Sequence, residues 1–133
     1  MTCRRACLAW LAAALGIALV GCGGQGEENL YELDPTRSCF RKADLNPSTK
    51  RLDFVASTAL GGAFRVRFPE NDLMITFGAA EPEAERIERA YRRFAPRRFP
   101  IQDVLRRDRN VVMLWGVAPT IDQLDTVNRC LQS

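Results

Sequence analysis

The sequence predicts an α+β fold, a two-layer sandwich in which a mainly antiparallel four-stranded sheet packs against helices. Three observations favour this class. Residues 64–68 and 73–77 alternate apolar and polar side chains, as half-buried strands do. Residues 81–95 carry apolar side chains at helical spacing, and residues 111–115 form an unbroken apolar run. Helices on either side of a run of strands favour the element order α-β-β-β-α-β-α.

The first expected element is a helix over residues 33–45. Asp34 is a good N-cap residue, and Pro35 suits the first helical position because its missing N–H needs no partner there. One side of this helix is expected to face the core, with Cys39, Phe40 and Ala43 on it.

Three short strands are expected next, over residues 52–56, 64–68 and 73–77, because each segment alternates apolar with other side chains. Residues 69–72 read Pro-Glu-Asn-Asp, a four-residue turn that joins the second and third strands into a hairpin. This turn is interpreted as polar rather than calcium-binding, since calcium needs several further oxygen ligands. The outward face of the hairpin is expected to carry Arg65, Arg67 and Thr76.

Residues 81–95 give the strongest helical pattern in the chain. Acidic residues crowd its first turn, where the positive end of the helix dipole favours them. Glu85 with Arg89, and Glu88 with Arg92, are spaced to form ion pairs four residues apart. Its apolar stripe is made by Ala84, Ile87, Tyr91 and Phe94.

The last two elements are a strand and a helix. The run over residues 111–115 shows no alternation, so we expect a strand near the centre of the sheet, covered on both faces. Thr120 and Gln123 are spaced as a capping box that begins the final helix. The inner stripe of that helix is expected to be Ile121, Leu124, Val127 and Leu131.

The N-terminus has the pattern of an export signal. Arg4 and Arg5 precede thirteen uncharged residues, 8–20. As a helix this run would be about 20 Å long, short of the ~30 Å hydrocarbon core of a bilayer. A basic flank followed by a short apolar run is typical of a secretory signal peptide rather than of a membrane-spanning helix.

The run ends in Leu19-Val20-Gly21-Cys22, which resembles the lipobox of bacterial lipoproteins. The resemblance implies cleavage before Cys22 and a thioether-linked diacylglycerol on its sulfur. It further implies export and anchoring by lipid on the extracytoplasmic side of the cell membrane or outer membrane. It covers the leader and the first mature residue only. An ordinary signal peptide followed by a cysteine is the alternative interpretation.

The chain is therefore expected to divide into three parts: a signal peptide over 1–21, a flexible tether over 22–32 and one α+β domain over 33–133. Residues 23–29 are polar and rich in glycine, a composition typical of a flexible linker. Seven such residues span roughly 15 Å root-mean-square, which would hold the domain close to the bilayer.

The expected processing of the N-terminus assigns a fate to each of the five cysteines. Cys3 and Cys7 leave with the leader, and Cys22 receives the lipid. Cys39 and Cys130 remain, in a compartment where disulfides persist, so we expect them to form one disulfide. Two buried free thiols are the alternative.

Composition argues against most enzyme classes. The chain has no histidine, which removes the commonest general base and metal ligand. It contains no Gly-x-Ser-x-Gly motif, no phosphate-binding loop and no histidine-based triad. We therefore expect no catalytic residue, no metal and no cofactor. A net charge of +3 gives no strong argument for nucleic acid, which an exported protein would not be expected to bind.

Arginine is the informative residue type, with 17 Arg against 2 Lys. Residues 84–109 carry nine arginines and four acidic residues, a local charge of +5. This segment could bind anionic head groups or an acidic envelope polymer. The alternative is a solvated helix face with its own ion pairs. The candidate anion-binding residues are Arg86, Arg89, Arg92, Arg93, Arg97, Arg98, Arg106 and Arg107.

Three functional hypotheses follow from these patterns. The favoured one is a non-enzymatic, lipid-anchored binding or accessory module whose partner is an envelope protein or an anionic polymer. The second is a carrier that holds a small apolar ligand between sheet and helices, which requires an apolar cavity of at least ~300 Å³. The third is a small enzyme with paired carboxylates across a cleft.

Overall fold

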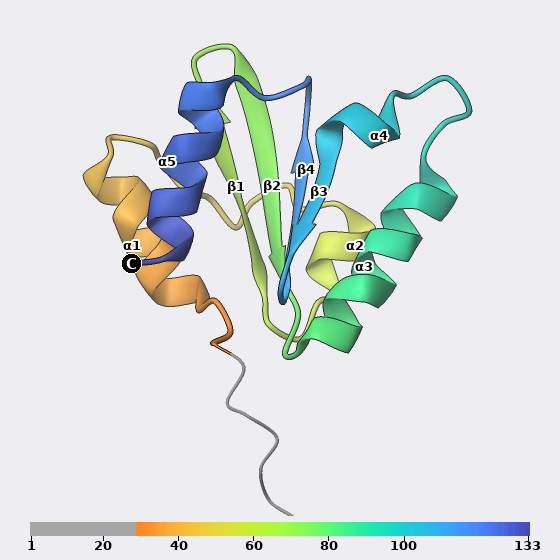
Figure 1. Cartoon of the computed structure of the whole chain (residues 1–133), viewed down its shortest axis with the longest axis horizontal. Helices are drawn as coiled ribbons and strands as arrows, with labels where there is room; N and C mark the ends of the chain where they lie inside the picture. The colour runs from red at the N-terminus through yellow and green to blue at the C-terminus, as the bar shows by residue number, and fades with distance from the viewer. Residues whose placement is uncertain (1–28) are drawn as a thin grey trace, which may run out of the picture.

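The computed structural model describes residues 29–133 and has an α+β fold built on an antiparallel sheet of four strands (Figure 1). The leader, Cys22 and the tether up to residue 28 lie outside the described residues. The order of strands across the sheet is β1-β2-β4-β3. The strands are β1 (Ala63–Phe68), β2 (Asn71–Phe77), β3 (Leu105–Asp108) and β4 (Val111–Trp115).

Helices cover both faces of this sheet. They are α1 (Leu33–Lys42), α2 (Phe54–Ser57), α3 (Glu81–Phe94), α4 (Ile101–Val104) and α5 (Ile121–Leu131). In Figure 1, α1 and α5 lie side by side on one face, while α2 and α3 lie on the other. The fold therefore has three layers where the sequence predicted two, and its element order is α-α-β-β-α-α-β-β-α. In the described part of the chain, no helix is both long and apolar enough to cross a bilayer.

Each face of the sheet has its own hydrophobic core. On the first face, Phe64, Leu73 and Trp115 are fully buried beneath Phe40 of α1 and Val127 of α5. On the second face, the α3 stripe packs on Leu105 and Val112. The apolar run of β4 is unbroken because the strand contributes side chains to both cores. β4 lies between β2 and β3, so its predicted central position is confirmed.

The predicted disulfide is confirmed. Cys39 of α1 and Cys130 of α5 are bonded, with their Cα atoms 5.2 Å apart. Cys130 is buried in the first core beside Val127 and Leu131, so the bond fixes the two helices of that layer to each other.

Several local predictions are also confirmed. β1 and β2 form a hairpin, with Phe68 opposite Asn71. The side chain of Thr120 accepts a hydrogen bond from the Gln123 backbone, and the Gln123 side chain accepts one from the Thr120 backbone. Asn71 and Asp72, expected in the hairpin turn, belong instead to β2, and Asp72 pairs with Arg65 and Arg67.

One predicted strand is wrong and another was missed. Residues 52–56 do not form a strand, because the Asp53 side chain accepts a hydrogen bond from Ala56 N and caps the short helix α2. The strand that the sequence did not predict is β3, which lies at the edge of the sheet and has one buried residue, Leu105. Its sequence, Leu-Arg-Arg-Asp, does not alternate apolar with polar residues. This segment is a strand because it pairs with β4.

Some expected faces also differ. Helix α1 begins at Leu33 with Glu32 as N-cap, so Asp34 and Pro35 lie inside its first turn. Ala43 is exposed beyond the end of α1, and Phe94 and Ile121 are exposed on the helices whose apolar stripes should have buried them. Thr76 does share a face with Arg65 and Arg67, but that face is covered by α3, and Thr76 is fully buried.

Candidate functional site

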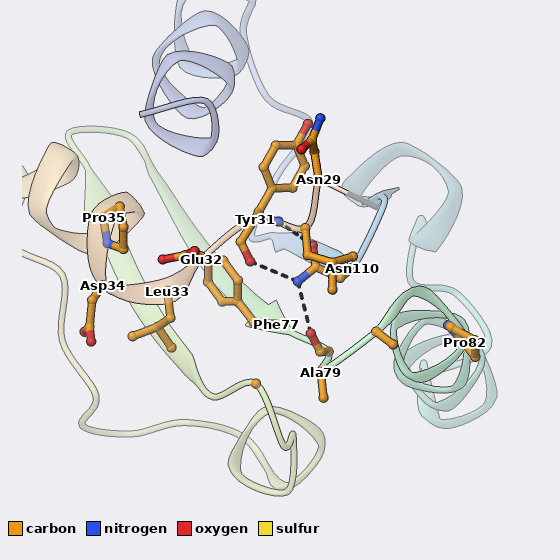
Figure 2. A pocket seen from close by; sticks show the side chains of 14 residues that line it. Asn29, Tyr31, Glu32, Leu33, Asp34, Pro35, Phe77, Ala79, Pro82 and Asn110 are labelled. Atoms are coloured by element: carbon orange, nitrogen blue, oxygen red, sulfur yellow. Dashed lines mark hydrogen bonds between the residues drawn. The ribbon is translucent and has the colours of Figure 1, made fainter. Parts of the chain in front are cut away.

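The N-terminal segment, residues 29–32, is fixed to the domain rather than free as predicted for the tether. The buried Asn110 accepts a hydrogen bond from Tyr31 N at 2.8 Å. Its amide donates to the carbonyl oxygens of Tyr31 and Gly78, each at 3.0 Å. Figure 2 shows these bonds in the pocket between the N-terminal segment and the start of α3. Both hydrogens and the oxygen of the Asn110 amide are used, so Asn110 attaches the N-terminal segment to the domain.

Tyr31 and Arg109 extend the same attachment. The Tyr31 hydroxyl donates to Asp108 at 2.7 Å, and the Arg109 guanidinium lies 5.0 Å from the centre of the Tyr31 ring. Arg109 also donates to the carbonyl oxygen of Asn29. Burial and the neighbouring Asp108 carboxylate raise the pKa of Tyr31. These contacts determine where the tether leaves the domain, at the end of the sheet that holds the β3–β4 turn.

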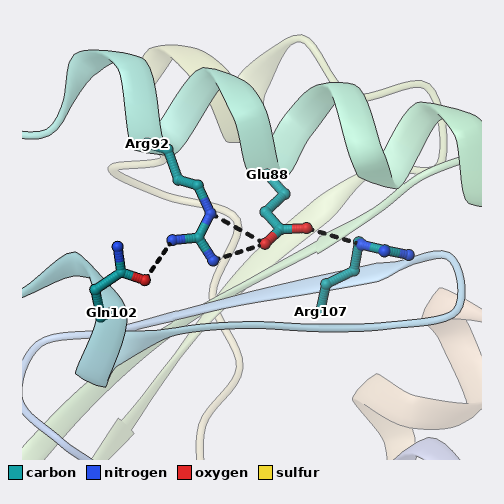
Figure 3. A network of polar contacts seen from close by, with 4 residues as sticks. All are labelled: Glu88, Arg92, Gln102 and Arg107. Carbon is teal, nitrogen blue, oxygen red and sulfur yellow. Dashed lines mark hydrogen bonds and ion pairs between the residues drawn. The ribbon is translucent and has the colours of Figure 1, made fainter.

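The arginine segment is partly neutralised by ion pairs. Glu88 accepts hydrogen bonds from Arg92 and Arg107, both with 2.8 Å contacts, and Arg92 also donates to Gln102 (Figure 3). Burial disfavours the charge on Glu88, but these bonds outweigh it and lower its pKa. The predicted pair of Arg89 with Glu85 is present at 3.7 Å. Three of the eight candidate arginines are thus paired.

The remaining candidates lie on different surfaces. Within residues 29–133, no ion pair involves Arg86, Arg93, Arg97, Arg98 or Arg106. Arg86 and Arg93 lie on the outer side of α3, and Arg97 and Arg98 lie in the exposed loop after it. Arg106 is opposite Met113, on the face of the sheet that α1 and α5 cover. The structure therefore does not bring all eight residues into one patch.

An apolar groove of about 580 Å³ lies between α2, the C-terminal end of α3 and the loop that follows it. Phe54 and Val55 contribute from α2, and Leu114 comes from β4. The α3 end and the loop contribute Tyr91, Phe94 and Phe99. We call this feature the apolar groove.

Two phenylalanines of this groove face solvent. Phe54 is 79% exposed and Phe94 is 69% exposed, although burial of a phenylalanine side chain is worth about 1.5–3 kcal/mol. Pro96 and Ala95 end α3 directly after Phe94 and direct the chain away from the sheet, so no element covers the ring. The exposed rings and the concave shape give the groove the character of a binding site.

A single polar cluster lies at the edge of the groove. The Tyr91 hydroxyl donates to both carboxylate oxygens of Asp53, at 3.0 and 3.1 Å, and lies 3.4 Å from the hydroxyl of the buried Thr76. Burial raises the pKa of Tyr91 well above its ordinary value, and the Asp53 carboxylate adds to the rise. Tyr91 therefore stays neutral and fixes Asp53 against the wall formed by α2.

Sequence patterns could not have located this groove. Phe54 was assigned to a strand and Phe94 to a buried stripe, so both were expected in the core. The one available signal was the Pro96 and Pro100 pair, which ends α3 and shapes the following loop. Comparison of the chain with known protein families, with curated proteins and with solved structures finds no match.

Proposed function

We propose that this protein is a lipid-anchored, extracytoplasmic binding module that holds the apolar part of a small ligand in the apolar groove. The observation that carries the proposal is the groove itself, whose walls are mainly hydrocarbon and two of whose aromatic rings, Phe54 and Phe94, are exposed. A volume of about 580 Å³ lies within the range of about 300–1,000 Å³ that is typical of small-molecule sites.

Loss of binding on removal of one exposed ring tests this function. Phe94→Ser should weaken binding of a neutral apolar fluorophore, such as N-phenyl-naphthylamine, about tenfold or more, because the ligand loses a wall of the groove. The control is Ile121→Ser, which removes another exposed side chain, 77% accessible, from α5 on the other face of the sheet. Equal binding by the two variants would contradict the proposal.

The lipid anchor is supported by the basic flank, the short apolar run and the Leu19-Val20-Gly21-Cys22 motif. Two acyl chains anchor a protein stably because each buried methylene contributes about 0.8 kcal/mol. Cys22→Ala should therefore move the protein from the detergent phase to the aqueous phase, whereas Cys7→Ala, within the leader, should not. A Cys22→Ala protein that stays in the detergent phase would show that the anchor is assigned wrongly.

A second candidate function is attachment to an anionic envelope surface through the arginine segment. It is favoured by the four exposed arginines of α3 and its following loop that form no ion pair with described residues: Arg86, Arg93, Arg97 and Arg98. Changing these four to glutamine should abolish retention on anionic liposomes. The charge-matched control changes Arg41, Lys42, Lys50 and Arg51 to glutamine; the first two end α1, and the other two lie between α1 and α2. Unchanged retention in the first variant would rule this function out.

Paired-carboxylate catalysis receives no support from the groove. Asp53 is its single carboxylate, and it already accepts hydrogen bonds from Tyr91 and from Ala56 N. Hydrolysis of this kind needs two carboxyl groups placed across a cleft.

A further inference from the structure

The distribution of charge around the apolar groove indicates which ligands it selects. We propose that the groove binds anionic single-chain amphiphiles, with the chain along its apolar walls and the head group at Arg97 and Arg98. This inference rests on the proposed function, since it specifies the ligand class of the same groove.

The walls of the groove suit a hydrocarbon chain. Phe54 and Val55 form one side, Phe94 and Phe99 form another, and Leu114 of β4 lies between the helices. None of these five side chains can accept or donate a hydrogen bond, so a ligand gains only from burial of its own apolar surface. Each methylene added to a chain that fits should increase affinity about fourfold.

The α2 side of the groove disfavours a negative charge. Asp53 lies there and is held by the Tyr91 hydroxyl at 3.0 and 3.1 Å and by Ala56 N at 2.8 Å. An anionic head group beside this carboxylate would meet a like charge. The head group of an anionic ligand must therefore lie at another part of the rim.

The loop side of the groove is strongly basic. Arg97 and Arg98 are exposed and lie between Pro96 and Phe99, two residues that line the groove. Neither Arg97 nor Arg98 forms an ion pair with a residue of the described chain. Arg92 is occupied by Glu88 and Gln102, so the arginines near the groove that form no ion pair in the described chain are Arg97 and Arg98 of the loop and Arg93 at the end of α3. A carboxylate or phosphate there could accept charge-assisted hydrogen bonds.

The groove and the N-terminal segment lie at opposite ends of α3. Helix α3 has 14 residues and is about 20 Å long, with Pro82 beside the N-terminal segment and Phe94 at the groove. The N-terminal segment lies beside the start of α3, and the groove is lined by residues at the other end of this helix. The groove thus opens about 20 Å beyond the point at which the tether joins the domain.

Calorimetric titration of the mature chain, with Cys22→Ser to remove the lipid, tests the inference. The ligands are decanoate and dodecanoate, with dodecanol and dodecyltrimethylammonium as neutral and cationic partners of equal chain length, all as monomers. We expect dodecanoate to bind at least about tenfold more tightly than dodecanol, and the cation to bind most weakly. Dodecanoate should bind more tightly than decanoate by about fourfold for each of its two additional methylenes.

Two variants separate the contributions of charge and chain. Arg97→Gln with Arg98→Gln should weaken dodecanoate about tenfold and leave dodecanol unchanged, whereas Phe94→Ser should weaken both ligands. The charge-matched control, Arg41→Gln with Lys42→Gln at the end of α1, should change neither affinity.

Three results would overturn the inference, each in a different way. Equal affinity for dodecanoate and dodecanol, insensitive to the Arg97 and Arg98 changes, would refute charge selection but leave the proposed function standing. Absence of binding by every ligand and by the neutral fluorophore would refute both. Binding to anionic vesicles, without binding of any monomeric amphiphile, would identify the surface as a membrane contact instead.

Discussion

Tyr91→Phe removes one oxygen atom from the polar edge of the apolar groove and leaves the aromatic ring in place. The ring is 7% exposed and packs with Ala84, Ile87 and Val112, contacts that phenylalanine would keep. What is lost is the hydrogen bond to the Asp53 carboxylate and the 3.4 Å contact with Thr76. The substitution therefore isolates the polar cluster from the packing around it.

The magnitude follows from the environment of each partner. A hydrogen bond to a charged group contributes about 1.5–3 kcal/mol to stability. Asp53 keeps its bond from Ala56 N and is reached by water, so we expect the lower part of this range, about 1.5–2 kcal/mol. Thr76 is fully buried and would lose its partner, so Thr76→Val in the Tyr91→Phe background should restore part of the loss.

Urea denaturation at equilibrium measures both effects as changes in midpoint at constant slope. Tyr31→Phe is the matched control, because its hydroxyl also donates to a carboxylate, Asp108, but at an exposed site. That change should cost less than about 1 kcal/mol. If Tyr91→Phe costs less than about 0.5 kcal/mol, or no more than Tyr31→Phe, the hydrogen bonds do not stabilise the groove as argued.

Two further predictions concern the rest of the fold. Replacing Cys39 and Cys130 with alanine should lower the free energy of unfolding by up to about 4.5 kcal/mol, because the disulfide closes a loop of 91 positions; a loss below about 1 kcal/mol in urea denaturation would refute this. Glu88→Gln should cost about 1 kcal/mol at neutral pH, since Arg92 and Arg107 lose a charged partner. Because the pKa of Glu88 is lowered in the folded state, its stabilisation is present above its ordinary value of 4.5 and is lost as pH falls below it. Denaturation curves of Glu88→Gln and wild type should therefore converge in acid, and an undiminished difference there would contradict the assignment.

The clearest patterns in the sequence were sufficient to predict the hairpin and the long helix. The alternation in 64–68 and 73–77 predicted the hairpin, and the helical stripe around Ile87 predicted α3. The same spacing failed at residues 52–56. There the Asp53 side chain accepts a hydrogen bond from Ala56 N and caps a turn of helix, which the spacing of Leu52, Phe54 and Ala56 could not indicate.

The sequence patterns also could not predict the edge strand of the sheet or which residues at the helix ends are exposed. Leu105 is the one buried residue of β3, so no pattern within that strand could indicate that β4 would pair with it. Phe94 and Ile121 continue apolar stripes, but each lies where its helix extends past the element it covers. Helical periodicity specifies the side of a helix and carries no information on whether anything packs against it.

The sequence by itself determined the α+β class, the central strand and the pairing of Cys39 with Cys130. Each of these depends on composition or on the spacing of residues along the chain. The tertiary structure alone decided that Glu88 also pairs with Arg107, and that an apolar groove opens beside α3. A groove forms where apolar residues from α2, α3, β4 and a loop converge and remain uncovered, and that depends on distances between elements that no local pattern encodes.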